Sequence, residues 1–262
     1  MISPSQLTLM ATHAALQAGA LLARGFGTSF TFSSKTEGRQ NLVTEFDYAA
    51  EKMIIDFLRV RTPGCAFLAE ESGHTKGTSE LLWIVDPLDG TVNFAHGIPF
   101  FCISIAAVWQ NEIVTGVVYQ PLLHELFTST KGEGAFLNGQ PIRTSQNRSP
   151  DQALVTTGFP TNVEDDPRGC IETFNQMLEK GFPIRRLGSA ALDLAYIAAG
   201  RFDAFWEVKL SPWDFAAGCL LIEEAGGQVT DYEGNSLSPQ DASTVLATNG
   251  ALHPLMLEVL KQ

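Results

Sequence analysis

The chain has 262 residues, enough for one large domain or two fused layers. Hydrophobic residues make up 45% and charged residues 18%, which excludes a disordered or collagen-like chain. Lys and Arg number 17 against 29 Asp and Glu, so the net charge is −12 at pH 7. This charge opposes binding to nucleic acid or to an anionic membrane, and we expect neither as a partner. An anionic ligand would need local positive charge, which a bound cation can supply.

No stretch has the composition of a membrane-spanning helix or a secretory signal. The longest uncharged stretch, residues 90–111, contains polar residues, and its apolar part is shorter than the ~20 residues that a membrane helix needs. The apolar run at residues 7–23 has no basic residue before Arg24. The cysteines at positions 65, 102, 170 and 219 form no CxxC pair, which is typical of reduced thiols and gives no zinc motif. We therefore expect a cytoplasmic protein.

Two helices are predicted at the start of the chain. Apolar residues at steps of three and four between residues 7 and 22 indicate the first, which ends near Gly25. Thr44 and Asp47 form a capping pattern that predicts a second helix, which Pro63 stops.

The middle of the chain is predicted to form a sheet. Two short apolar runs end directly before the acidic residues Glu70 and Asp86, so both carboxylates stand at the carboxyl end of a strand. Asn138-Gly139 is typical of a tight turn. Strands are predicted over residues 65–69, 81–85 and parts of 100–130.

The second half is predicted to alternate helices and strands. Residues 147–168 are rich in Pro, Asp, Asn and Arg, and they are the candidate hinge between two subdomains, residues 1–146 and residues 147–262, which form one compact unit. Helices are predicted over 171–180, 190–199 and 213–225, and a strand over 204–207.

The sharpest local motif is the run from Asp86 to Thr91, in which a buried strand ends in two carboxylates. The proline after Asp86 fixes a turn, so Asp86 and Asp89 can converge on one point with the Leu88 carbonyl between them. The amides of Gly90 and Thr91 then face outward at the start of a helical turn, where an anion can bind. This donor set suits a metal ion with a phosphate. An ordinary turn rich in Asp, Pro and Gly is the alternative.

Other acidic residues have structural alternatives of their own. Ser211 and Asp214 form an ordinary helix start, with the carboxylate favoured by the helix dipole. Asp47 has the same capping alternative, and Glu70 with Glu71 fits a solvated acidic pair.

Four of these acids share a position that favours a joint function. Glu70, Asp86, Asp89 and Asp214 each lie where a strand ends or a helix begins, which is where layered α/β proteins gather their sites. Four carboxylates can hold two or three Mg²⁺ ions, which promote in-line displacement at phosphorus. Bound cations would also draw an anionic ester to an acidic protein.

Competing motifs are missing from the sequence. It has no Walker-type phosphate loop, no HExxH metalloprotease motif and no GxSxG nucleophile elbow. An aspartyl nucleophile of the haloacid dehalogenase type needs two acids at D-x-D spacing, whereas Asp86 and Asp89 stand one residue further apart.

The motifs resemble those of the inositol monophosphatase-like, Mg²⁺-dependent and lithium-sensitive phosphatases. Asp86-Pro-Leu-Asp-Gly-Thr-Val-Asn-Phe94 is similar to the first signature of this family, and Trp213-Asp-Phe-Ala-Ala-Gly218 with Glu224-Ala-Gly-Gly227 is similar to the second. Residues 42–47, 68–72, 132–139 and 188–190 follow the order and approximate spacing of the family, so the resemblance spans roughly residues 10 to 260.

The resemblance implies a set of metal ligands. The first Mg²⁺ would use Glu70, Asp86 and the Leu88 carbonyl, and the second would use Asp86, Asp89 and Asp214. A weaker third ion would bind through water to Glu70, and lithium would take the place of the second ion.

The resemblance also implies catalytic and substrate-binding residues. Thr91 and Asp47, together with Glu70 at the third ion, would activate the attacking water. The residues expected to contact the phosphate or the alcohol part of the substrate are Asp89, Gly90, Thr91, Gly188, Ser189, Ala190, Glu207 and Asp214.

The fold implied by the resemblance is an α+β sandwich of five layers, α-β-α-β-α, in a homodimer. The implied activity is hydrolysis of myo-inositol 1-phosphate or a similar sugar or polyol phosphate, a small-molecule ester. Fructose 1,6-bisphosphatase and histidinol-phosphate phosphatase are alternatives within the family, and Lys209 near Glu207 is either a solvated lysine or a contact for a second phosphate. A further alternative is a regulatory binding protein with an incidental metal site, as in bacterial relatives that act in transcription complexes.

Overall fold

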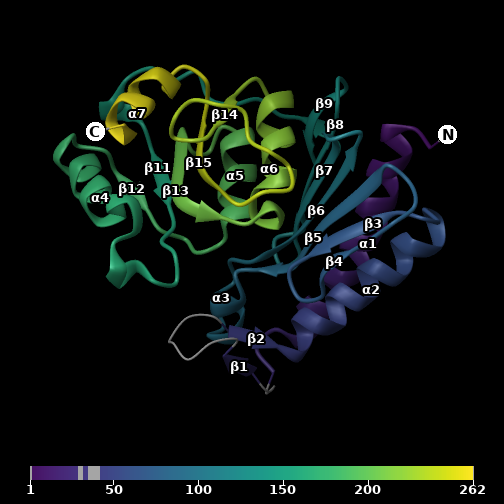
Figure 1. The fold of residues 1–262 in the computed structure, drawn as a ribbon. Helices are drawn as coiled ribbons and strands as arrows, with labels where there is room; N and C mark the ends of the chain where they lie inside the picture. Colours follow the sequence, from purple (N-terminus) through teal and green to yellow (C-terminus); the bar gives the residue numbers. More distant parts are fainter. Residues whose placement is uncertain (1, 29–31, 35–41, 262) are drawn as a thin grey trace.

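Secondary structure is stacked in five layers (Figure 1). The computed structural model describes residues 2–28, 32–34 and 42–261. Over this part of the chain the layers are a helix pair, an eight-stranded sheet, a second helix pair, a five-stranded sheet and a third helix pair. This order confirms the predicted α+β sandwich.

The first layer consists of α1 (Pro4–Gly25) and α2 (Glu45–Arg61), which confirm both predicted helices. Each begins with a capping box, and in α2 the box is made by Thr44 and Asp47 as the sequence predicts. The apolar residues of both helices pack against the large sheet, α1 over β6 and β7 and α2 over β5.

The second layer is the eight-stranded sheet, in the order β10-β9-β8-β7-β6-β5-β3-β4. Neighbours are antiparallel except β3 and β5, which run parallel, so these two strands bring their carboxyl ends to the same edge. The predicted turn at Asn138-Gly139 joins β9 to β10, and both turn residues have positive φ. The strands are β3 (Ala66–Ala69), β4 (Gly73–Thr75), β5 (Leu81–Asp89), β6 (Cys102–Trp109), β7 (Glu112–Gln120), β8 (Glu125–Thr130), β9 (Gly134–Leu137) and β10 (Gln140–Pro141).

The third layer consists of α5 (Ala190–Ala198) and α6 (Pro212–Glu224), which are buried between the two sheets. The helix α6 approaches β7 so closely that a Cβ atom on Gly116 would lie 2.6 Å from the Ala217 carbonyl oxygen. Glycine therefore sets the distance between α6 and the large sheet.

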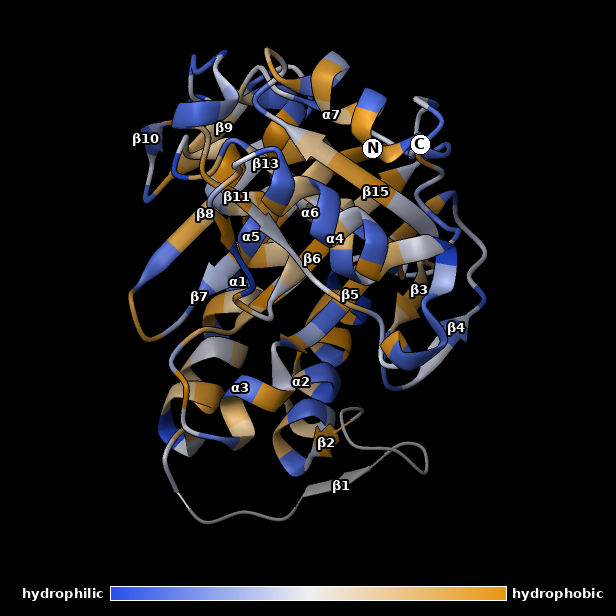
Figure 2. Cartoon of the chain, turned by 90° about the vertical axis from the view of Figure 1, so that its left-hand side faces the viewer, coloured by the Kyte–Doolittle hydropathy of each residue, from blue (hydrophilic) through white to orange (hydrophobic). Residues whose placement is uncertain are grey.

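The fourth and fifth layers come from the second half of the chain. The small sheet has the order β12-β11-β13-β15-β14, and α4 (Cys170–Glu179) and α7 (His253–Leu260) cover its outer face. In Figure 2 strand β15 is mostly hydrophobic, whereas α2 and α4 show hydrophobic and hydrophilic residues. The strands are β11 (Val155–Thr157), β12 (Ile184–Arg185), β13 (Ala204–Leu210), β14 (Gln228–Thr230) and β15 (Ser243–Thr248).

Several elements differ from the predicted ones. Strand β5 continues to Asp89, so the motif that was predicted to follow a strand forms its last residues. The segment predicted as a hinge contributes β11 to the small sheet. The other short elements are α3 (Thr91–Ala95), β1 (Phe32–Ser34), β2 (Leu42–Thr44) and the 3-10 turns η1 (Pro150–Gln152), η2 (Val163–Asp165) and η3 (Pro167–Gly169).

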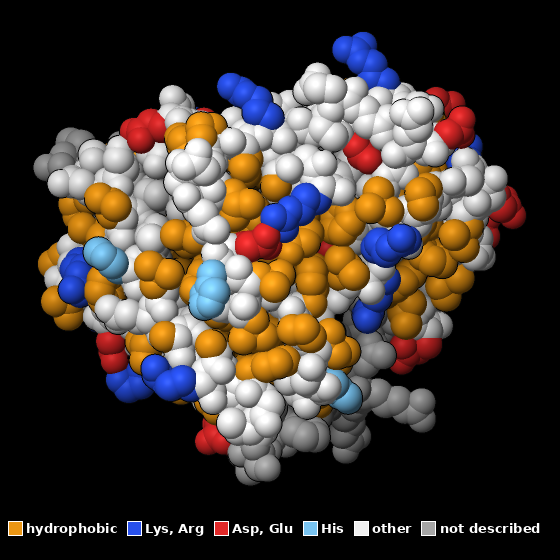
Figure 3. All heavy atoms as spheres, turned by 180° about the vertical axis from the view of Figure 1, so that it is seen from behind, with side chains coloured by type: hydrophobic (Ala, Val, Ile, Leu, Met, Phe, Trp, Pro, Cys, Tyr) orange, Lys and Arg blue, Asp and Glu red, His pale blue; other side chains and the backbone are white. Residues whose placement is uncertain are grey.

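The two halves of the chain share one core. The apolar cluster around α5 and α6 includes residues of both sheets, such as Ile84 and Phe205. All four cysteines are buried and free. The surface seen from behind combines hydrophobic patches with scattered charged side chains (Figure 3). None of the described helices has both the length and the apolar character needed to cross a membrane.

Acid stability is expected to depend on His253, which is buried at the start of α7. Its ring nitrogens lie 3.0 Å from the hydroxyl oxygens of Thr230 and Thr248, and burial lowers the pKa of His253 to about 4. Above pH 6.5 the ring is neutral in both states. As the pH falls towards 4, only the unfolded chain binds the proton, so His253 lowers the free energy of unfolding by about 2 kcal/mol between pH 7 and pH 5.

Urea unfolding of wild type and H253Q at pH 7 and pH 5 tests this expectation. Between pH 7 and pH 5 the free energy of unfolding should fall by about 2 kcal/mol less in H253Q than in wild type. Equal pH dependence in the two proteins would show that the ring does not resist protonation.

Candidate active site

The site is centred on the carboxyl end of β5. Asp86 is 2% exposed, and its Oδ1 accepts a hydrogen bond from the Leu88 amide (3.0 Å). Pairing between β5 and β6 shifts register between Asp86 and Asp89, which marks a bulge. This irregularity changes the direction of the chain between the two carboxylates.

Glu70 follows β3, the parallel neighbour of β5, and its amide donates to the Val85 carbonyl (3.2 Å). The segment after Glu70 is held by a buried carboxylate of α2, that of Glu51. Its two oxygens accept hydrogen bonds from the amides of Glu71 (2.7 Å) and Ser72 (2.9 Å). Glu51 therefore fixes the backbone beside Glu70.

Asp47 and Thr91 are brought together from α2 and α3. Asp47 is fully buried, and its Oδ2 accepts from the amide (2.8 Å) and hydroxyl (2.5 Å) of Thr44. Its Oδ1 accepts from the Thr91 hydroxyl (2.9 Å), which also lies 3.0 Å from the Leu88 carbonyl oxygen. Burial raises the pKa of Asp47. The Asp47 side chain thus caps α2 and also contacts Thr91.

Asp89 connects the large sheet to α5. Its Oδ2 accepts hydrogen bonds from the Ser189 hydroxyl (2.7 Å) and the Ala191 amide (2.8 Å). The loop before α5 is held in turn by Asn93, whose amide donates to the carbonyls of Phe100 (2.7 Å) and Leu187 (2.8 Å). Residues about 100 positions apart in the sequence therefore meet at this carboxylate.

Asp214 lies in the first turn of α6. Its Oδ2 accepts from the Ser211 amide (2.7 Å), which completes the predicted capping box. Asp214 also lines the same cavity as Asp89. The helix cap and the site thus use one carboxylate.

The carboxylates destabilise one another's charged forms. Burial, followed by the charge of Glu70, raises the pKa of Asp86 well above its ordinary range. Burial raises the pKa of Asp214 in the same way, with further contributions from Asp89 and Glu70. Burial raises the pKa of Asp89 to about 6, although its hydrogen bond from Ser189 acts in the opposite direction. Such a group of acids is stabilised by a shared cation.

The donor set fits Mg²⁺ in chemistry, because it consists of carboxylate and carbonyl oxygens. No described Lys or Arg forms an ion pair with Asp86, Asp89 or Asp214. As placed, no three His, Cys, Asp or Glu side chains of the described residues converge on a common ion position. Binding of an ion would therefore require the carboxylates to turn towards it.

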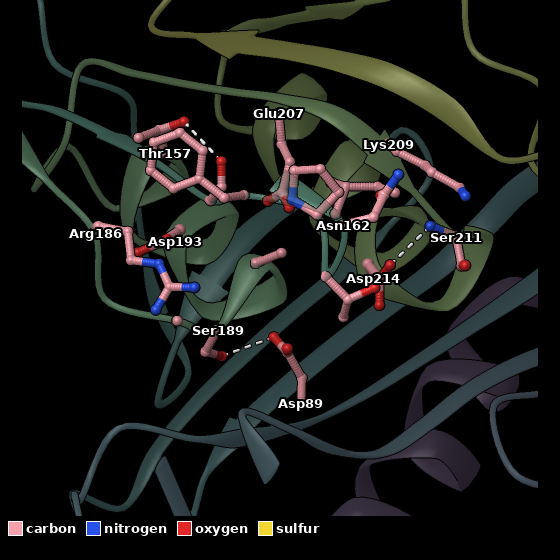
Figure 4. Close-up of a pocket in the computed structure, with 17 residues that line it drawn as sticks. Asp89, Thr157, Asn162, Arg186, Ser189, Asp193, Glu207, Lys209, Ser211 and Asp214 are labelled. Atoms are coloured by element: carbon pink, nitrogen blue, oxygen red, sulfur yellow. Dashed lines mark hydrogen bonds between the residues drawn. The ribbon is translucent and has the colours of Figure 1, made fainter. Parts of the chain in front are cut away.

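Two cavities, of about 310 and 240 Å³, share part of their lining. Asp89, Asp214 and Glu207 line the larger one (Figure 4), and Glu70 lines the smaller. Asp47, Asp86 and Leu88 are buried and line neither cavity. The remaining predicted residues are Ser189 and Ala190 at the larger cavity, Gly90 and Thr91 at the smaller one, and Gly188 at both.

Glu207 lies on β13, opposite Asp89 in the larger cavity (Figure 4). A Cβ atom on Gly158 would stand 2.1 Å from its Oε2, so the carboxyl group packs directly on the backbone of Gly158. Burial, followed by the charge of Asp89, raises the pKa of Glu207 to about 8. This end of the cavity therefore offers a carboxyl group that holds its proton more tightly than usual.

Sequence reasoning missed several residues that build this site. Glu51 resembles any helix-surface acid in the sequence, and nothing local links it to Glu70. Asn93, Arg186 and Asp193 were missed as well, since their roles depend on segments brought together by the fold. The spacing of Ser189 and Asp193, four residues apart on a helix, was the one available signal.

The geometry can be compared with known proteins. The sequence profile of the inositol monophosphatase family matches residues 3–262. The chain belongs to the inositol monophosphatase family. This membership supports a phosphatase of this family.

Individual relatives carry two kinds of name. An inositol-1-monophosphatase of Caulobacter vibrioides is 41% identical over 252 residues, which cover 95% of this chain and 98% of the relative. The Nus factor SuhB of Escherichia coli is 44% identical over 226 residues, covering 86% of this chain and 85% of that protein. The crystal structure of the extragenic suppressor protein suhB from Bartonella henselae has a TM-score of 0.90 and 40% identity, and covers 98% of each chain.

Glu51 is expected to tune the affinity for Mg²⁺. In E51Q an amide group would face the two backbone N–H donors and could accept from only one of them, so the segment beside Glu70 would shift. We expect Mg²⁺ to bind about 10- to 100-fold more weakly, the usual effect of losing a residue that orients a metal ligand. Isothermal titration calorimetry measures this affinity.

A matched control is E224Q. Glu224 likewise accepts hydrogen bonds from two backbone amides, of Gly132 (2.7 Å) and Gly134 (2.8 Å), but lines neither cavity. The E224Q protein should bind Mg²⁺ with the same affinity as wild type. An equal loss of Mg²⁺ affinity in E51Q and E224Q would show that the effect comes from general destabilisation of the fold.

Proposed function

We propose that the protein is a Mg²⁺-dependent phosphomonoesterase that hydrolyses myo-inositol 1-phosphate or a similar sugar or polyol phosphate. The observation that carries this proposal is the buried carboxylate of Asp86 with the half-buried carboxylates of Glu70, Asp89 and Asp214 at one edge of the large sheet, beside the hydrogen-bonded pair Asp47 and Thr91. Membership of the inositol monophosphatase family supports it. A homodimer and inhibition by lithium, both typical of the family, belong to the same proposal.

In this proposal one Mg²⁺ would be held by Glu70, Asp86 and the Leu88 carbonyl, and a second by Asp86, Asp89 and Asp214. A third would bind more weakly, through water to Glu70. Bound Mg²⁺ polarises phosphoryl oxygens, lowers the pKa of water and neutralises the leaving oxygen. The raised pKa values of the three aspartates are consistent with this role, because each charged form gains from a nearby cation.

Thr91 and Asp47 would move the proton of the attacking water. The water gives a proton to the Thr91 hydroxyl oxygen while Thr91 passes its own proton to Asp47 Oδ1, 2.9 Å away. The raised pKa of buried Asp47 favours this transfer. The Leu88 carbonyl and the amide and hydroxyl of Thr44 keep the pair oriented.

The two cavities would divide the substrate between them. The phosphate group would lie near Gly90, Thr91 and Glu70, which line the smaller cavity. The alcohol part would extend into the larger cavity towards Ser189 and Glu207. This division orients the ester with its leaving oxygen towards Asp89 and Asp214.

The proposal is tested by phosphate release from myo-inositol 1-phosphate, fructose 1,6-bisphosphate and histidinol phosphate, each with and without Mg²⁺. We expect Mg²⁺-dependent hydrolysis with the inositol ester preferred, and D89N should fall to the level of the buffer blank because it removes a charged ligand. Preference for the bisphosphate would move the function to sugar metabolism and make Lys209 the next residue to mutate. Absence of hydrolysis with every ester would contradict the proposal.

A second candidate function is a regulatory binding role with an incidental metal site. The similarity to proteins named Nus factor SuhB favours it. The two functions can be separated in cells, because D89N removes a carboxylate of the site without changing the outer surface of the fold.

A strain carrying D89N in place of the wild-type gene is expected to show the phenotype of a gene deletion if hydrolysis is the function that the cell needs. The level of folded D89N protein in the strain is the control. A normal phenotype together with abolished turnover would assign the cellular role to binding.

A further inference from the structure

Asp193 is a buried acidic residue in the wall of the larger cavity. None of the roles predicted above involves it. It lies on α5, is 1% exposed and lines the cavity together with Glu207 (Figure 4). Its Oδ1 atom has no hydrogen-bond partner. Buried polar atoms are nearly always partnered in folded proteins, so an atom of this kind in a cavity wall calls for a partner from a ligand.

Neighbouring charges do not satisfy Asp193. Arg186 lines the same cavity, but no described ion pair joins the two side chains. Burial raises the pKa of Asp193 well above its ordinary range, and the nearby Thr156 hydroxyl, whose oxygen is also buried without a partner, opposes this rise. The charges of Asp89 and Glu207 add to the rise, and the charge of Arg186 opposes it. A carboxyl group accepts hydrogen bonds and, when protonated, can also donate one, and a hydroxyl group matches either pattern.

Asp193 lies on α5 one helical turn after Ser189, the residue that contacts Asp89. Ser189 is the N-cap of α5, the Asp193 amide one turn later donates to the Ser189 carbonyl (3.0 Å), and both residues line the larger cavity. Ser189 contacts Asp89 at the metal end of the cavity. Asp193 therefore lies further along the same cavity, beyond the position of the ester.

We propose that Asp193 is a specificity-determining residue, which together with Glu207 forms a subsite for the hydroxyl groups of the alcohol part of the substrate. This inference rests on the proposed function and deepens it. Two carboxyl groups in one cavity wall can form hydrogen bonds with neighbouring hydroxyl groups of a polyol. A hydroxyl group can donate a hydrogen bond to a carboxyl oxygen whereas an ionised phosphate cannot, so the subsite selects a polyol monophosphate over a bisphosphate.

The test compares wild type with D193L, because leucine has the same number of side-chain heavy atoms as aspartate, branches at the same carbon and needs no hydrogen bond. D193L should melt no lower than wild type, since it removes an unpartnered polar group. D193N is the conservative variant and should keep part of the selectivity, because its amide still donates and accepts. Y232F is the control for the loss of a buried polar group: the Tyr232 hydroxyl is also buried without a partner and lies near the charge of Glu207, but Tyr232 lines neither cavity.

The readout is the ratio of kcat/KM for myo-inositol 1-phosphate to kcat/KM for phenyl phosphate, whose alcohol part carries no further hydroxyl. We expect this ratio to fall at least about tenfold in D193L, by less in D193N and not at all in Y232F. An unchanged ratio in D193L, or a parallel loss with both esters, would overturn the role of Asp193 while leaving the phosphatase intact.

A binding measurement separates this inference from the proposed function. If wild type hydrolyses neither ester, the phosphatase proposal is wrong. Calorimetry with a phosphonate analogue of myo-inositol 1-phosphate, in which a methylene group replaces the bridging oxygen, then decides on Asp193. Binding to wild type that weakens at least about tenfold in D193L supports the subsite. Equal affinity, or no binding to wild type, refutes it.

Discussion

Repulsion among buried carboxylates is the constraint around which this protein is built. Asp86, Asp89 and Asp214 come from two elements, and each has a pKa raised by burial and by the other acids. Their arrangement costs folding free energy in the absence of a cation. The fold compensates with backbone donors to each group, from Leu88, Ala191 and Ser211. The same strain provides the affinity that a divalent cation would gain on binding.

The layered architecture determines which residues reach this point. Parallel pairing of β3 and β5 brings Glu70 and Asp86 to one edge, and α6 approaches closely enough to add Asp214 because Gly116 lacks a side chain. The loop before α5 adds Ser189 from the second half of the chain. Since the core around α5 and α6 is shared by both sheets, the site and the interior of the protein depend on the same contacts.

The acidic groups at the two ends of the cavities differ in their surroundings. The acids near β5 need a cation, and with it they would attract a phosphate. At the opposite end Glu207 and Asp193 are raised in pKa by burial and suit neutral hydroxyl groups. Under the proposed function, the two ends of a polyol phosphate would be bound by different means, with cations at one end and carboxyl groups at the other.

The sequence by itself determined the local structure: the capping boxes of α1 and α2, the turn at Asn138-Gly139 and the acids at the ends of strands all follow from short-range geometry. Its motifs also gave the family and the five-layer fold. Only the tertiary structure decided that Glu51 holds the segment beside Glu70, that Asn93 anchors the loop before α5, and that Asp193 faces the cavity without a partner. These roles depend on contacts between residues far apart in the chain, which no local spacing encodes.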